Sequence, residues 1–288
     1  MGYSIINDII FKIVFASEEN RPLLMALLNA ILGFSGKDKI VEIKILNPNI
    51  DKEFMQEKNS ILDIKARDAQ NRYYNIEVQV EPDRHYKERS MYYLSRLFGG
   101  QLEPGMKYGA LMKTIGISIT DFTLFEELPE LHNIYRFMNI SRPHELTDKL
   151  ELHYIELSKY NKEKPYKEMT IFEKWLYLLK YSELYSDRLE PIPEALHEEE
   201  GIEMAITAFR KAISKDEVRE MIEFRHKARL DEASRLDDML NAGIEKGIEK
   251  GIEKGKIEGK IESAKIFLEM GGDRSEIAKR LGLKETDF

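Results

Sequence analysis

The sequence contains no cysteine, and this absence excludes two kinds of architecture. Disulfide bonds cannot stabilise the fold, and thiolate-ligated metal centres cannot form. The six histidines show no HxxxH or similar ligand spacing, so the sequence does not indicate a histidine-based metal site either. A chain without cysteine suits a reducing compartment.

Long apolar runs are also missing. No stretch approaches the ~18 consecutive apolar residues of a membrane-spanning helix. The first eight residues lack the basic segment that precedes the apolar core of a signal peptide. We therefore expect a cytoplasmic protein that has no membrane partner.

An excess of positive charge is missing as well. The formal net charge is -8 and the pI is near 5.5, which argues against broad non-specific attraction to nucleic acid. Any contact with DNA must therefore be local. With 288 residues, of which 42% are hydrophobic, the chain can bury a sizeable core, and we expect one main domain with an appendage.

What the sequence does contain is a set of polar side chains that share one face of two strand-like segments. Apolar residues alternate with Asp63 in residues 61–66, and with Glu77 and Gln79 in residues 73–80. The polar residues between the two segments are typical of a hairpin turn.

The length of the turn decides which residues face each other. A three-residue loop at residues 69–71 puts Asp63 opposite Glu77, and Ile61 opposite Gln79. A loop with an even number of residues would oppose Asp63 to Ile76 and turn an apolar row to the wrong side of the sheet. We therefore predict the three-residue loop.

Two opposed carboxylates repel each other, because their Cβ atoms lie only about 5 Å apart. Mg²⁺ or Mn²⁺, held by one or two carboxylates together with water and phosphate oxygens, would compensate this repulsion. Alternatively Lys65, on the same face, neutralises the pair as an ordinary solvated ion cluster. The residues alone favour neither interpretation.

The remaining periodicity predicts the order α-α-β-β-β-α-β, followed by further strands. The expected helices cover residues 3–15, 19–33 and 86–98, and the expected strands outside the hairpin cover residues 40–46, 114–120, 134–140 and 150–157. Beyond about residue 165 the pattern is mostly helical. We expect three parts, which are an α/β domain (1–165), a helical extension (166–242) and a repeat helix followed by a helix pair (243–288).

The third part opens with a repeated Gly-Ile-Glu-Lys tetrapeptide. Glycine costs a helix about 1 kcal/mol per residue relative to alanine, yet isoleucines form a slowly drifting stripe beside the glycines. We expect two such helices to pack closely in a homodimer; the alternative is a flexible, solvated linker. After the repeat, Asp273 and Glu276 are spaced as in a capping box, and the last segment looks like the first half of a helix-turn-helix. Too few residues follow Leu283 for a recognition helix, so helix-pair docking is expected there.

Several of these segments together resemble the PD-(D/E)XK nuclease family transposases, also called the Rpn or recombination-promoting nuclease family. The resemblance covers most of residues 5–160 and the tail. It rests on the repeat and on the segments at residues 7–15, 58–66, 75–80, 92–97 and 150–157. It implies an α/β fold with a restriction-endonuclease-like α-β-β-β-α-β core and a helical C-terminal extension.

The resemblance also implies a Mg²⁺-dependent DNA endonuclease that acts in recombination or in mobile-element biology. It maps the metal-binding aspartate onto Asp63, the second catalytic acid and metal ligand onto Glu77, and the third catalytic position onto Gln79. The wider superfamily has lysine at this third position, which would help to deprotonate the attacking water, whereas glutamine only forms hydrogen bonds. Asp8 falls where an additional acidic metal ligand is often found; its alternative role is an i,i+4 partner of Lys12.

Three basic residues, Lys12, Arg89 and Arg96, are candidates for phosphate contacts. Lys12, or Lys65, could supply the cation that Gln79 lacks, while Arg89 and Arg96 lie seven residues apart on one helical stripe. An ordinary salt-bridged helix face is the alternative for these two arginines. A catalytically inactive relative that serves as a DNA-binding or protein-assembly module is the alternative for the whole chain.

Overall fold

The computed structural model describes residues 3–47, 63–161, 164–186, 192–197, 199 and 201–288. The chain divides into two compact units, Met1–Arg225 and His226–Phe288. Each unit is considered by itself below.

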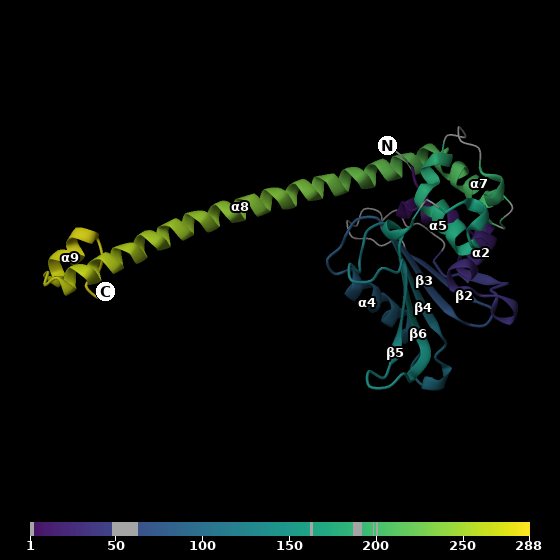
Figure 1. Cartoon of the computed structure of the whole chain (residues 1–288), viewed down its shortest axis with the longest axis horizontal. Helices are drawn as coiled ribbons and strands as arrows, with labels where there is room; N and C mark the ends of the chain where they lie inside the picture. Colours follow the sequence, from purple (N-terminus) through teal and green to yellow (C-terminus); the bar gives the residue numbers. More distant parts are fainter. Residues whose placement is uncertain (1–2, 48–62, 162–163, 187–191, 198, 200) are drawn as a thin grey trace. The chain divides into compact units, whose positions relative to one another are not determined.

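A six-stranded mixed sheet forms the centre of the first unit (Figure 1). Its strand order is β1-β2-β3-β4-β6-β5. Pairing is antiparallel from β1 to β3, parallel from β3 through β4 to β6, and antiparallel between β6 and β5. The strands are β1 Ile43–Ile45, β2 Ile64–Asp68, β3 Tyr73–Gln79, β4 Thr114–Thr120, β5 His132–Met138 and β6 Glu145–Glu156.

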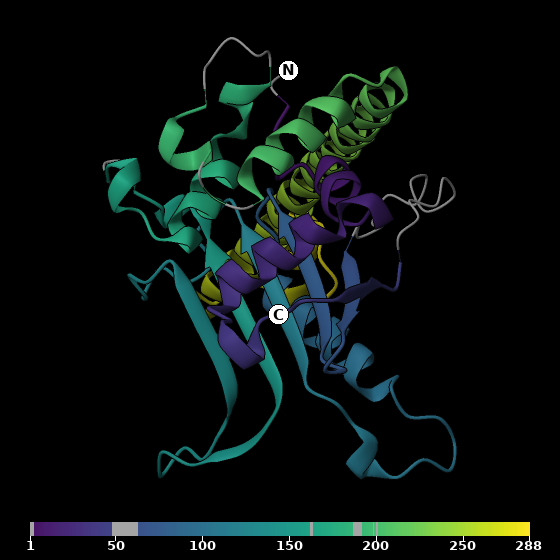
Figure 2. The same ribbon diagram turned by 90° about the vertical axis from the view of Figure 1, so that its right-hand side faces the viewer.

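Helices cover both faces of this sheet. The N-terminal helices lie across one face (Figure 2), where α1 contacts β3 and α7, and α2 contacts β1 and α5. On the other face α4 contacts β3, β4 and β6. The helices described are α1 Asp8–Phe15, α2 Arg21–Leu32, α4 Tyr86–Gly99, α5 Ile171–Tyr181, α6 Glu194–His197, α7 Ile202–Ile213, α8 Asp216–Glu269 and α9 Arg274–Leu281. The α-α-β-β-β-α-β order is therefore confirmed.

Local capping explains where the first two helices begin and end. Helix α1 begins at Asp8 rather than at residue 3, because the Asn7 side chain accepts hydrogen bonds from the N–H groups of Ile9 and Ile10 at 3.1 and 3.3 Å. Helix α2 ends at Gly33, which adopts the left-handed conformation with φ of 64°. The end of this helix agrees with the expected range of residues 19–33.

The β2–β3 hairpin has the predicted register. Ile64 pairs with Ile76 and Lys65 pairs with Asn75, which leaves a three-residue loop whose last residue, Asn71, has a positive φ of 62°. Extending this register by one residue puts Asp63 opposite Glu77. The expected partner of Gln79, at residue 61, lies outside the described residues.

Asp68 fixes the loop of this hairpin. Its carboxylate accepts hydrogen bonds from the Gln70 N–H at 2.9 Å, the Arg72 Nε at 2.6 Å and the Tyr74 hydroxyl at 2.8 Å. A buried side chain thus holds both ends of the turn at once. Because a slip of one residue would turn every side chain to the opposite face, this anchor also fixes which side chains of β3 face α4.

Three strands differ from the prediction, two in length and one in position, and hydrogen bonding explains the two differences in length. β1 begins only at Ile43, because the Asn29 side chain, and not a neighbouring strand, bonds both the N–H and the C=O of Ile40. β6 begins at Glu145, five residues before the Leu150 that pairs with β4, because its first part pairs with β5 alone. β5 covers His132–Met138 instead of residues 134–140.

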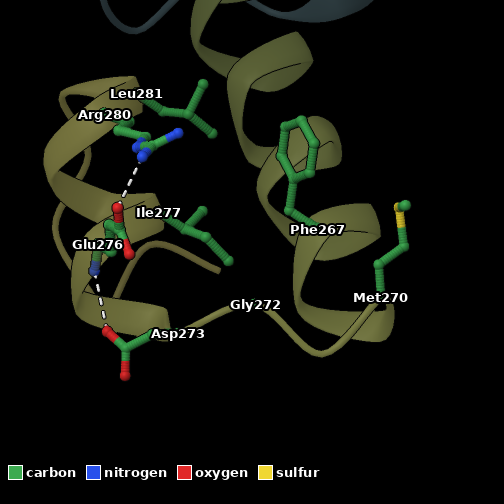
Figure 3. Close-up of a pocket in the computed structure, with 8 residues that line it drawn as sticks. All are labelled: Phe267, Met270, Gly272, Asp273, Glu276, Ile277, Arg280 and Leu281. Carbon is green, nitrogen blue, oxygen red and sulfur yellow. Dashed lines mark hydrogen bonds and ion pairs between the residues drawn. The ribbon is translucent and has the colours of Figure 1, made fainter.

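In the second unit, α9 turns back against the end of α8. The Asp273 side chain caps α9 by accepting from the Glu276 N–H at 3.0 Å, while the Glu276 carboxylate pairs with Arg280 at 2.7 Å. One half of the expected capping box is thus formed. A cavity of about 420 Å³ lies between the two helices. Figure 3 shows the residues that line it, Phe267, Met270, Gly272, Asp273, Glu276, Ile277, Arg280 and Leu281. Across the described parts of both units, no helix is at once long enough and apolar enough to span a membrane.

Candidate functional site

The candidate site lies on the face of β3 that α4 covers. Alternation along β3 directs Tyr74 and Ile76 into the core shared with α1, and Asn75 and Glu77 to the opposite face. Helix α4 packs on this face above Gly116 of β4, where a Cβ would lie only 2.8 Å from the Leu152 side chain of β6 and 3.4 Å from Leu94 of α4. The row of polar side chains is therefore buried beneath a helix.

Asp63 is held in place by its neighbours at the start of β2. It is only 8% exposed, and the Asn47 amide donates to its backbone oxygen at 3.0 Å and to its Oδ1 at 3.2 Å. The other carboxylate oxygen lies 3.3 Å from the Lys65 ammonium. In the alternative interpretation Lys65 neutralises both Asp63 and Glu77. The structure shows its ion pair with Asp63.

Arg89, from α4, contacts the other acidic residue of the site. Its Nη2 donates to Glu77 Oε1 at 2.9 Å and to Gln79 Oε1 at 3.0 Å, and its Nη1 donates to Asp83 Oδ2 at 2.6 Å. The guanidinium also lies 5.0 Å from the centre of the Tyr86 ring. Arg89 thereby links β3, the loop after β3 and α4.

The surroundings of Glu77 favour the binding of a cation. It is 3% exposed, and its Oε2 is buried without a hydrogen-bond partner among the residues that the structure describes. Burial raises the pKa of the Glu77 carboxyl to about 7, against the lowering effect of the Arg89 guanidinium and with a further increase from the Asp63 charge. A buried acceptor that is left unsatisfied is costly, so this oxygen is suited to a cation.

Lys12 reaches the same site from α1. It is 6% exposed, and burial lowers the pKa of its ammonium group, while the nearby Asp63 charge raises it and Lys65 lowers it. A lysine buried beside the candidate metal ligands can supply the positive charge that Gln79 cannot.

The structure brings Glu77, Gln79 and Arg89 into contact, with Asp63 opposite Glu77 in the extended register and Lys12 close enough to Asp63 for their charges to interact. Asp8 and Arg96, the other two candidates, have different surroundings. The Asp8 carboxylate forms an ion pair with Arg225 at 2.8 Å and also accepts from the Ile9 N–H at 2.9 Å. Arg96 lies on the exposed surface of α4, with its guanidinium 5.8 Å from the centre of the Tyr92 ring.

Sequence reasoning missed two residues that shape the site. Asn47 orients Asp63, and Asp83 holds Arg89. Asn47 was visible only as the end of a strand next to a proline. Asp83 lies in a loop, where the spacing of apolar residues does not predict which side chains form a site. Only its position shortly before the first turn of a helix could have indicated a role in the site.

The carboxylates that are present fit a magnesium-type ion. Among the described residues no three His, Asp or Glu side chains gather into a metal-binding group. Mg²⁺ does not require such a group, because it keeps several waters and binds one or two carboxylates together with substrate phosphates. Asp63 and the unpartnered oxygen of Glu77 provide that smaller donor set.

Comparison with known proteins gives one match. No curated protein and no solved structure matches the chain. A family-wide sequence model, that of the PD-(D/E)XK nuclease family transposases, matches residues 5–239. The match includes every candidate site residue, and the mixed sheet flanked by helices agrees with a PD-(D/E)XK nuclease-like fold. Both the fold and the resemblance seen in the sequence are confirmed, and the chain belongs to the PD-(D/E)XK nuclease family transposases.

Proposed function

We propose that this protein is a metal-dependent endonuclease that hydrolyses phosphodiester bonds in DNA, in recombination or at mobile elements in the cytoplasm. The observation that carries the proposal is the buried Glu77 Oε2, which has no hydrogen-bond partner among the described residues and belongs to a side chain in register with Asp63. Membership of a nuclease family supports the same reaction.

In this proposal Asp63 and Glu77 hold Mg²⁺ or Mn²⁺. When bound, the ion polarises the phosphate and lowers the pKa of a water that attacks phosphorus. The residues of the chain itself position the metal-binding carboxylates and neutralise negative charge on the phosphate. Asn47 keeps the Asp63 carboxylate in one orientation, and Lys12 places a fixed positive charge where negative charge develops on the phosphate oxygens.

Gln79 has a positioning role in this scheme. Its Oε1 accepts from Arg89, and its Nε2 donates to the Glu81 backbone oxygen at 2.9 Å. Both the oxygen and the nitrogen of the Gln79 amide are thus hydrogen-bonded, and an amide cannot take up a proton from water. We assign the cationic role of the superfamily lysine to Lys12.

DNA contacts in this proposal are local, because the chain is acidic overall. Arg96 is the exposed candidate for a phosphate contact, and Lys12 and Arg89 are the candidates inside the site. Asp8 could join the metal ligands only by giving up its ion pair with Arg225, so two protein carboxylates are the simpler donor set.

We further propose a homodimer formed through the repeat of α8. A Cβ built on any of the repeat glycines would meet no other atom within 4 Å, so nothing else in the described chain requires them to be glycine. The neighbouring isoleucines are about half exposed. The glycines concerned are Gly243, Gly247, Gly251, Gly255 and Gly259, and the exposed isoleucines are Ile244, Ile248, Ile252 and Ile257.

The second candidate function is a catalytically inactive module that binds DNA or assembles with other proteins. The Arg89 guanidinium favours it, because it already neutralises Glu77 in a site whose third position is glutamine.

A plasmid-nicking assay separates the two functions. With Mg²⁺ present, we expect Asp63→Ala and Glu77→Ala each to reduce cleavage about 100-fold or more, because a bound metal supplies several kcal/mol of transition-state stabilisation. Glu88→Ala, which removes an exposed carboxylate from α4, is the matched control and should cut like the wild type. Circular dichroism checks that each variant is folded. Equal cleavage by the wild type and both site variants would place the activity elsewhere.

A further inference from the structure

Arg89 occupies the same carboxylate that the proposed metal requires. Its Nη2 lies 2.9 Å from Glu77 Oε1, and its side chain is three-quarters buried against α4 and β3. Such a charge-assisted hydrogen bond is stronger than one between neutral groups, particularly where water is excluded. A divalent ion at Glu77 therefore meets a cation that is already bound.

The hydrogen bonds of Arg89 are divided between two carboxylates. Nη2 serves Glu77 and Gln79, whereas Nη1 lies 2.6 Å from Asp83, which belongs to the loop between β3 and α4. Asp83 is more exposed than Glu77, so solvent can share in its interaction. The arginine thus has a second partner that stays available when Glu77 binds something else.

Arg89 and a divalent ion compete for Glu77 because both are positively charged. Glu77 carries at most one negative charge, and the guanidinium and a divalent ion each gain from it while repelling each other. Two ligands that compete for one group reduce each other's affinity by the same factor. An interaction that holds Arg89 on Glu77 therefore lowers the metal affinity of the site. An interaction that draws Arg89 towards Asp83 raises this affinity.

We propose that Arg89 is a built-in competitor of the divalent metal at Glu77, and that Asp83 is the anchor that draws it away, so that the two residues together set the metal affinity of the site. The inference rests on the proposed metal site at Asp63 and Glu77. It assigns to Arg89 a positioning role that precedes any contact with DNA.

The test is a titration of the full-length protein with Mn²⁺, without DNA, in which the electron paramagnetic resonance signal reports free Mn²⁺. Arg89→Gln should bind Mn²⁺ about fivefold or more tightly than the wild type, within the usual range of coupling between two ligands. Asp83→Asn should bind it more weakly, because Arg89 then depends more on Glu77. Arg89→Lys keeps the charge and should stay closer to the wild type than Arg89→Gln.

Two controls separate this inference from the proposed function. Lys87→Gln removes a positive charge from the exposed side of the same helix and should leave the Mn²⁺ affinity unchanged. Asp63→Asn should remove the binding site. If wild-type binding survives Asp63→Asn, the proposed metal site is wrong and the inference is lost with it. If binding depends on Asp63 but Arg89→Gln binds no more tightly, or Asp83→Asn binds no more weakly, the competition is refuted while the metal site remains.

Discussion

Asp63 and Glu77 are both acidic residues, and their surroundings give them different properties. Asp63 sits beside an amide and an ammonium group, each within 3.3 Å of its carboxylate. Glu77 lies under α4, where one oxygen meets Arg89 and the other has no hydrogen-bond partner in the described chain. In a pair of this kind the more buried carboxyl controls the pH dependence, because it is the one whose charge is costly.

Glu77 therefore makes the metal-free fold less stable as the pH rises. Its folded-state pKa of about 7 exceeds the ordinary 4.5, so the native state holds a proton that the unfolded state has already released between these values. The stability that protonated Glu77 contributes is fully present below pH 4.5. It is lost as the pH rises towards 7, by on the order of 3 kcal/mol. Urea unfolding at several pH values should show this slope in the wild type and a flatter one in Glu77→Gln. Parallel slopes would contradict the raised pKa.

Gln79 gives a second prediction for a single residue. Gln79→Lys restores the positive charge of the superfamily's third position, and we expect cleavage in saturating Mg²⁺ to be retained or raised. Gln79→Met, of similar size but without hydrogen bonds, should lower it about tenfold, in line with the loss of one hydrogen bond to a charged group. Loss of activity in Gln79→Lys with unchanged metal binding would show that the comparison with lysine does not apply to this site.

The opposition of Asp63 and Glu77 was predictable, whereas the partner of Arg89 was not. Strand alternation and an odd loop length act within one hairpin, so a short stretch of sequence contains all that is needed to derive the register. The contacts of Arg89 to Glu77, Gln79 and Asp83 depend on how α4 docks on the sheet. A single sequence does not contain that docking geometry.

Among the elements, α4 has the expected bounds to within one residue, but the face that it buries was not predicted. Its buried side chains, Tyr86, Ser90 and Leu94, recur every four residues, but one of them is a serine, which weakens the apolar pattern. The Ser90 hydroxyl meets the Tyr154 hydroxyl at 2.6 Å beneath the helix. A polar contact between distant segments thus contributes to the docking, and this is why periodicity found the helix but not the face that it covers.

Strands β5 and β6 contain a buried chain of ionisable side chains that the sequence did not reveal. His132 Nε2 lies 2.9 Å from His153 Nδ1, and His153 Nε2 lies 2.6 Å from Glu151. Lys113 and Arg136 also donate to Glu151, at 2.9 and 2.7 Å. Despite burial, which acts to raise it, hydrogen bonds from His153 and Lys113 hold the pKa of Glu151 at about 2.

His132 should make the β5 edge sensitive to acid. Burial, and then the neighbouring His153, lower its pKa from 6.5 to about 4, so the unfolded state takes up a proton before the folded state does. The stability contributed by neutral His132 is present above pH 6.5 and is lost as the pH falls towards 4, by on the order of 2 kcal/mol after allowing for partial exposure of the ring.

His132→Gln, which keeps a hydrogen-bonding side chain, should flatten this acid slope in urea unfolding experiments. Glu77 titrates in the opposite direction over part of the same range, so the comparison is best made in a Glu77→Gln background. An identical acid slope with and without His132 would refute the assignment.

At the scale of the whole chain, the second unit leaves much apolar surface exposed. Besides the isoleucines of the repeat, Phe267 and Met270 are exposed at the cavity between α8 and α9 (Figure 3). The sequence predicted the repeat helix and its apolar stripe. It did not show that α8 starts as early as Asp216 and passes through residue 243 without a break, because residues 166–242 and the repeat were expected as separate parts.

Removal of the repeat and the segment after it should change the oligomeric state of the protein and the products of DNA cleavage. Truncation before Gly243 should convert the dimer into a monomer in analytical ultracentrifugation, because the stripe that two chains would bury is lost. Burying apolar area returns about 25 cal/mol per Å², enough over several isoleucines to offset the cost of the glycines. A dimer carries two nuclease sites, one for each DNA strand, so truncation should also shift double-strand cutting towards nicking.

Glycine-to-alanine substitution separates the dimer from a flexible linker without shortening the chain. Within one chain, a methyl group at Gly247, Gly251 or Gly255 meets no other atom within 4 Å, and alanine favours the helix by about 1 kcal/mol per residue. In a linker the triple alanine variant should therefore raise the helix content and leave the mass unchanged. In a closely packed dimer the added methyl groups hold the two backbones apart, so the same variant should become more helical and at the same time dissociate. If neither the truncation nor the triple alanine variant changes the number of chains in the particle, the dimer is refuted and the repeat is a linker.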